Sequence, residues 1–169
     1  MVRNFSCSLS CVAAAACLLS TLICQVSLAA GAGERVELAR SGAGSLTVDA
    51  EIAGVPARFI VDTGAGMVTV DRSLFKQMRR NGDIREVKRV AARLANNRLQ
   101  MMTVYEVSHF RVGDTCELGP IEIAVMEGAG RNLMGLSALG RAAPFTIHTS
   151  PPSITLSGCG SAPTLAAAH

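Results

Sequence analysis

One short segment places a single carboxylate inside an apolar run. In "FIVDTGAGMVTV", from Phe59 to Val70, Asp62 is followed by the hydroxyl residue Thr63 and then by Gly64. Glycine permits a sharp backbone turn, so a strand that ends this way presents its aspartate on a tight, stiff loop. Two carboxylates held about 3 Å apart cannot both ionise, and they share one proton. One then acts as a base toward water and the other as an acid toward a carbonyl, which is amide hydrolysis without a metal.

The chain contains the Asp-Thr-Gly triplet only once, so it offers only one carboxylate of this kind. The segment most similar to the Asp-Thr-Gly triplet is "GDTC" at Gly113–Cys116, where Cys116 replaces the required glycine. We interpret this segment as a turn. The hypothesis therefore requires a homodimer. The two Asp62 side chains would meet on its two-fold axis, with the same surface of each subunit at the contact.

The residues around this loop predict mostly short strands. Leu46, Val48, Ala50 and Ile52 alternate with polar residues, and "AGVP" supplies a turn before "ARFIVDTG", which together predict a hairpin. Helices are predicted only at "RSLFKQMRRNG", with Asp71 as the N-cap, and briefly within "RNLMGLSALGRAA". Further strands are expected in "MVTVD", "LQMMTVYEVSHFRVG", "PIEIAVME", "PFTIHT" and "SITLSG". This pattern predicts an all-β, barrel-like domain.

The first 30 residues have the composition of an export signal. Arg3 is their one charge, and an apolar run extends from Val12 to about Ala30, with small residues suited to cleavage near Ala29–Ala32. The run is almost as long as the roughly 20 residues that span a bilayer, so an uncleaved membrane anchor through residues 12–30 is the alternative. We expect a periplasmic or secreted protein, with residues 31–44 as a linker, 45–157 as the domain and 158–169 as a disordered tail.

Cysteines and histidines do not form a metal motif in the sequence. Four of the six cysteines lie in the leader, and the other two, Cys116 and Cys159, could form one disulfide or remain separate thiols. His109, His148 and His169 are too scattered for a zinc site or a catalytic triad. No phosphate-binding glycine motif is present either, and we expect neither a metal nor a cofactor.

A basic stretch covers residues 76–98, although the formal net charge of the chain is only +3. Asp83 and Glu86 offset its cations only in part, and no aromatic residues interleave them. This favours a solvated surface over a site for nucleic acid or an anionic membrane, and we expect no nucleic-acid partner. The cations are Lys76, Arg79, Arg80, Arg85, Lys88, Arg89, Arg93 and Arg98.

The segment "FIVDTGA" resembles the active-site signature of aspartic proteases, and the short chain is similar to their retropepsin-like branch (clan AA, single-lobed bacterial type). "SLTVDAEIAGVPARFIVDTGA" resembles the opening hairpin of that branch. "NLMGLSALGR" resembles its later element, with Leu133, Met134 and Gly135 before a helix from about Ser137 to Arg141. "VAARLANNRLQ" falls where the family's flap and neighbouring strand would be, with Asn96 and Asn97 at the tip. The resemblance covers roughly Ser45 to Leu156.

The resemblance implies a single-lobed barrel and an exported, homodimeric aspartic endopeptidase. Asp62 would be catalytic, Thr63 would bond across to the partner's loop, and Gly64 would shape the loop. A peptide or protein substrate would lie extended across the dimer, under a flap from each subunit. Gly66 departs from the family, because many relatives carry Ser or Thr there. A catalytically inactive module that uses this fold for binding or assembly in the cell envelope is therefore the alternative.

Overall fold

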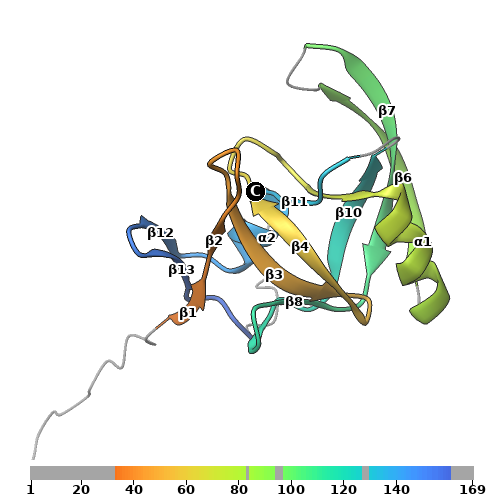
Figure 1. Cartoon of the computed structure of the whole chain (residues 1–169). Coiled ribbons are helices and arrows are strands. Elements are labelled where there is room, and N and C mark those ends of the chain that lie inside the picture. The colour runs from red at the N-terminus through yellow and green to blue at the C-terminus, as the bar shows by residue number, and fades with distance from the viewer. Residues whose placement is uncertain (1–32, 83, 94–96, 127–129, 161–169) are drawn as a thin grey trace, which may run out of the picture. The chain divides into compact units, whose positions relative to one another are not determined.

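The computed structural model describes residues 33–82, 84–93, 97–126 and 130–160 (Figure 1). The leader, residues 1–30, and the tail residues 161–169 lie outside the described residues, so the signal peptide or anchor stays a prediction. Among the residues that are described, no helix is long and apolar enough to cross a membrane.

Within the described part of the chain the strands form two sheets, which confirms the predicted all-β class. The larger sheet has the order β6-β7-β10-β5-β11-β4-β3-β8-β9 with β2 on β3, and the smaller has the order β1-β13-β12. Two helices accompany them, α1 (Arg72–Asn81) and α2 (Leu136–Arg141). The strands are β1 Glu34–Glu37, β2 Ala39–Arg40, β3 Leu46–Ile52, β4 Val55–Val61, β5 Val68–Asp71, β6 Ile84–Arg93, β7 Leu99–Val107, β8 Phe110–Val112, β9 Cys116–Glu117, β10 Ile121–Met126, β11 Leu133–Met134, β12 Phe145–Thr149 and β13 Pro152–Leu156.

The β3–β4 hairpin follows the predicted alternation. Val48, Ala50 and Ile52 are buried, while Leu46, at the start of the strand, is only partly covered. The turn uses Ala53 and Gly54 at positive φ, 48° and 73°, the left-handed geometry that a two-residue hairpin turn requires. Pairing then runs from Ile52 opposite Val55 to Thr47 opposite Ile60, so Asp62 comes directly after the paired part of β4.

Helix α1 is also confirmed, together with its cap. Asp71 accepts a hydrogen bond from the backbone N–H of Leu74 at 2.7 Å, which satisfies one donor of the first turn. The helix buries Leu74, Phe75 and Met78, and Gly82 follows its last residue. Phe75 lies against Tyr105 of β7, with ring centroids 4.5 Å apart, so α1 is fixed to the larger sheet.

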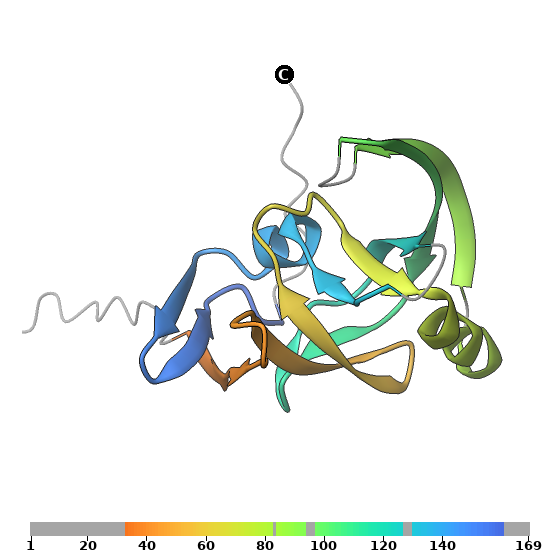
Figure 2. The same ribbon diagram turned by 45° about the horizontal axis from the view of Figure 1, so that its top comes forward.

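The predicted flap region forms a long hairpin of β6 and β7, which projects beyond the rest of the larger sheet (Figures 1 and 2). Near its tip Asn97 has φ 64° and accepts a bond from Arg93 at 2.6 Å, whereas Asn96 lies outside the described residues. Two basic side chains of β6 pair with acids of neighbouring strands, Arg85 with Glu106 at 2.9 Å and Lys88 with Glu122 at 2.7 Å. The charges of β6 are exposed, in agreement with a solvated surface.

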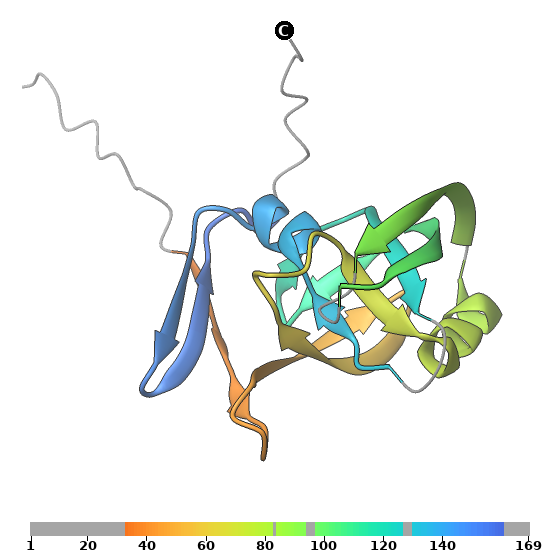
Figure 3. The ribbon, with the colours of Figure 1, turned by 90° about the horizontal axis from the view of Figure 1, so that it is seen from above.

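The prediction of a linker over residues 31–44 is wrong for its central part. Residues 34–37 form β1, which pairs antiparallel with β13, and residues 39–40 form β2 on β3. Figure 3 shows β1 beside the β12–β13 hairpin, where β13 is its neighbour. Val36 of β1 and Leu38 between the two strands are buried, so this segment contributes to the core, although each strand has too few residues for a visible alternation. The folded unit therefore starts before Ser45.

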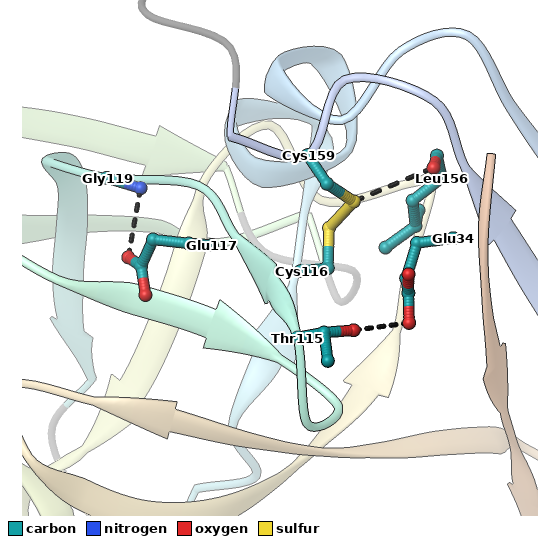
Figure 4. The surroundings of a disulfide bond; sticks show 7 residues. All are labelled: Glu34, Thr115, Cys116, Glu117, Gly119, Leu156 and Cys159. Atoms are coloured by element: carbon teal, nitrogen blue, oxygen red, sulfur yellow. Dashed lines mark hydrogen bonds between the residues drawn. A yellow bond between two sulfur atoms is a disulfide. The ribbon is translucent and has the colours of Figure 1, made fainter. Parts of the chain in front are cut away.

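A disulfide joins Cys116 and Cys159, with Cα atoms 4.8 Å apart (Figure 4). Of the two alternatives left open by the sequence, the structure has the bridge. The "GDTC" echo is a turn as predicted, with Gly113 at φ 62°. The predicted tail is wrong for residues 158–160, because the bridge and a bond from Gly160 N–H to the Glu117 carbonyl, at 2.8 Å, hold them to the fold.

Removing the bridge should lower the stability of the domain. It closes a loop with a sequence separation of 43, for which the chain-entropy model gives about 3–4 kcal/mol. We expect reduced wild-type protein and the Cys116→Ala/Cys159→Ala variant to unfold at a clearly lower denaturant concentration than the oxidised protein. Equal midpoints for all three samples in urea titrations would contradict this expectation.

Candidate active site

Asp62 stands at the end of β4, in a turn that its own carboxylate stabilises. Its Oδ1 accepts a bond from the Gly64 N–H at 2.9 Å, and its carbonyl accepts one from Ala65 N–H at 3.2 Å. The Asp62 N–H donates to the Met134 carbonyl at 3.1 Å, which fixes the residue to β11. Asp62 is partly buried, while Thr63 and Gly64 are exposed. The carboxylate is thus held in place at the surface of its own subunit.

Strand β11 lies between β4 and β5 and holds both ends of the loop. Leu133 pairs with Ile60 of β4 in parallel and with Thr69 of β5 in antiparallel orientation. This two-residue strand lies in the middle of the larger sheet, so β4 and β5 are not bonded to each other directly. The loop from residue 62 to residue 67 therefore spans β11 at one edge of the sheet.

The start of α2 bonds the same loop from the other side. Leu136 N–H donates to the Ala65 carbonyl at 2.8 Å, and Ser137 N–H donates to the Gly66 carbonyl at 3.1 Å. The Ser137 hydroxyl in turn accepts a bond from Val68 N–H at 2.9 Å. These bonds use N–H groups that the first turn of a helix leaves unpaired.

Gly135 makes this contact possible, because the backbones approach too closely for any side chain. A Cβ at this position would lie 2.3 Å from the Met67 carbonyl oxygen and 2.6 Å from that of Ala65. Gly135 has φ −87°, which any residue can adopt, so the need for glycine comes from space alone. At Gly66, in contrast, a Cβ would meet no atom within 4 Å.

An open hollow of about 420 Å³ lies beside the Asp62 loop. Asp62 is its one acidic residue in the described part of the chain, so one subunit supplies half of the carboxylate pair that the sequence predicts. Most other side chains that line it are apolar, and Arg131 is the one cation among them. The lining consists of Ser45, Leu46, Ile60, Val61, Asp62, Thr63, Arg131, Leu133 and Ile147.

Asn132 is a structural residue of the site that the sequence analysis missed. Its side chain accepts from the Asp71 N–H at 3.0 Å and donates to the Arg58 carbonyl at 3.2 Å, while its own carbonyl accepts from Ile60 N–H at 2.9 Å. It thus ties β4 to β5 just ahead of β11. The available signal for Asn132 was a polar residue directly before the apolar pair in "NLMG". Ser137, which bonds Val68 N–H, was also missed, and its signal was a hydroxyl residue in the apolar segment "GLSALG".

Two arginines near the site differ in their partners. The Arg58 guanidinium donates to both carboxylate oxygens of Asp49, at 2.7 and 3.1 Å, and these bonds lower the pKa of Asp49. Since both side chains are largely exposed, the pair contributes little to stability. Arg131 makes no hydrogen bond or ion pair with another described residue.

The two histidines in the described part of the chain, His109 and His148, do not line the hollow beside Asp62. His109 lies 4.0 Å from a carboxylate oxygen of Glu117, His148 is in β12, and His169 is outside the described residues. Over residues 33–160, apart from the short undescribed stretches, no group of His, Cys, Asp and Glu has the arrangement of a metal site.

Comparisons with known proteins agree with this fold. Residues 48–141, more than half of the chain, match the family model described as "gag-polyprotein putative aspartyl protease". Among solved structures, the chain is similar to a retropepsin-like aspartic protease from Rickettsia conorii, with a TM-score of 0.56 and 21% identity. That match covers 72% of this chain and 89% of the other. No curated protein matches the chain.

The fold and the site loop together define a retropepsin-like protein of the aspartic protease class. The chain belongs to the gag-polyprotein aspartyl protease family, in agreement with the resemblance seen in its sequence. The predicted single-lobed retropepsin-like fold is confirmed.

The Gly135 contact yields a stability prediction with a matched control. Gly135→Ala should lower the free energy of unfolding by about 2–3 kcal/mol or more, because two carbonyl groups must move to admit the methyl group. Gly66→Ala makes the same chemical change in the same loop, where space is free, and should change the stability by less than about 1 kcal/mol. Urea unfolding compares the two, and equal losses would contradict the steric role of Gly135.

Proposed function

We propose that the protein is an exported aspartic endopeptidase that acts as a homodimer. The observation that carries this proposal is the Asp62 loop, in which the carboxylate is held by Gly64 and the loop by β11 and α2. Membership of the aspartyl protease family gives the class of chemistry, and the open hollow gives room for a substrate.

In the proposed mechanism the two Asp62 carboxylates share one proton. Each has one oxygen, Oδ1, occupied by the Gly64 N–H, and Oδ2 has no bond to a described residue, which leaves it for water or for the partner. The ionised Asp62 takes a proton from water, which attacks the scissile carbonyl, and the protonated Asp62 donates to the carbonyl oxygen. Proton transfer to the leaving nitrogen then breaks the C–N bond.

We infer that a second subunit is needed because Asp62 is the one carboxylate among the described residues that line the hollow. Asp62 alone cannot provide both an acid and a base, and the loop around it is exposed rather than covered by its own subunit. Strand β12 forms one edge of the smaller sheet, and its Ile147 lines the same hollow. An unpaired strand edge next to the site is suited to a subunit contact.

A peptide would bind in extended form between the Asp62 loop and the β6–β7 hairpin. Strand-like substrates obtain affinity from backbone hydrogen bonds and specificity from side-chain pockets. The Cys116–Cys159 bridge supports export, because disulfides persist in oxidising compartments such as the periplasm or the outside of the cell.

Replacing the carboxylate tests the catalytic role. Asp62→Asn retains the size of the side chain and an oxygen for the Gly64 N–H, so the fold should persist while peptide cleavage falls by roughly 10³-fold or more. Purified wild-type and variant protein are assayed on a peptide library from acid to neutral pH, with and without a statin-type transition-state mimic. Identical behaviour of the two proteins would reject the protease and favour a binding module of the cell envelope.

Substitutions at Thr63 test dimer formation separately from catalysis. If its exposed hydroxyl bonds the partner's loop twice in a symmetric pair, Thr63→Ala should weaken dimerisation by about tenfold. Thr63→Ser keeps the hydroxyl and serves as the control. Sedimentation measures the dissociation constant directly, and a wild-type protein that stays monomeric at every concentration would rule out the paired site.

A further inference from the structure

Arg131 is the charged neighbour of Asp62 in the hollow at the candidate active site. The hollow contains the side chains of Asp62, Thr63 and Arg131 on a wall that is otherwise mostly apolar. Arg131 also lines a second hollow of about 430 Å³. The side chain is exposed and has no polar partner among the described residues.

The backbone at Arg131 is fixed by the residue that follows it. Asn132 makes three hydrogen bonds, to Asp71, Arg58 and Ile60, and so joins β4 to β5. On the other side, Gly130 packs near Met126, since a Cβ there would lie 3.1 Å from its sulfur. The backbone that carries the guanidinium is therefore held beside the two hollows that Arg131 lines.

The other basic residue nearby is already engaged. Arg58 lines the second hollow, but Asp49 occupies its guanidinium through two hydrogen bonds. Arg131 also forms no ion pair within 4.0 Å with Asp62, although both line one hollow. A carboxylate brought in by a ligand would thus find an available planar donor, which can bind both of its oxygens at once.

We propose that Arg131 determines substrate specificity, by selecting peptides that carry Asp or Glu close to the scissile bond. The apolar part of the hollow, with Leu46, Ile60 and Leu133, receives the hydrocarbon part of the peptide, and the guanidinium binds the acid. This inference rests on the proposed protease function and adds the substrate class to it: acidic peptide segments with neighbouring apolar residues.

The test compares Glu, Gln and Lys at each of three positions on either side of the cleaved bond, using the full chain of the wild type and of each variant. Wild-type protein should prefer Glu over Gln at one or two positions by about five- to tenfold in kcat/KM. This preference should become smaller at high salt, because salt screens the attraction between the guanidinium and the acid. Arg131→Gln should remove this preference, and Arg131→Glu should replace it with a preference for Lys at the same positions. Arg79→Glu makes the same charge change on the exposed side of α1, outside the hollow, and should leave the preference unchanged.

A binding measurement separates this inference from the protease proposal. In the Asp62→Asn background, fluorescence anisotropy with Glu-containing and Gln-containing peptides needs no cleavage, and the Glu peptide should bind about five- to tenfold more tightly when Arg131 is present. Equal affinities for the two peptides, or a Glu preference that survives Arg131→Gln, would overturn the inference even if cleavage is observed. A Glu preference without cleavage would support Arg131 and reject the protease.

Discussion

The site depends on one close contact, between the backbone at Gly135 and the loop that follows Asp62. A methyl group at Gly135 would lie 2.3 Å from the Met67 carbonyl oxygen, so the two backbones are too close for any residue other than glycine at this position. Only at this distance can the first N–H groups of α2 bond the carbonyls of Ala65 and Gly66. The position of the Asp62 carboxylate is therefore fixed by a segment about 70 residues later in the sequence, as well as by its own turn.

Strand β11 shows why the contact is stable. It is only two residues long, yet it bonds β4 in parallel and β5 in antiparallel orientation, and Met134 is almost fully buried. Asn132 adds side-chain bonds to both neighbouring strands immediately before it. A short strand held on both edges cannot shift in register without losing all these bonds, and a slip by one residue would expose Met134. The register thus holds Gly135 opposite the loop.

Local signals account for what the sequence predicted well. The alternation of β3, the turn at Gly54 and the cap of α1 by Asp71 are each set by residues near one another in the chain, and each was found. The features that were missed depend on distant partners. Asn132 and Ser137 act across 61 and 69 residues, and the spacing of Cys116 and Cys159 could not decide whether the two form a bridge. Strand β6 is exposed along most of its length, so its residues carry no buried face that a pattern could reveal.

The loop geometry has a consequence for assembly. Every bond described for the loop from residue 62 to residue 67 comes from its own subunit, through β11, α2 and the turn itself. In the proposed homodimer, association therefore brings together two half-sites that are already formed, rather than ordering a flexible loop. Preorganisation of this kind reduces the entropy lost on binding. It also means that the carboxylate pair exists only while the subunits are together, so hydrolysis would be limited by protein concentration, and an isolated subunit, with its single acid, would be inactive.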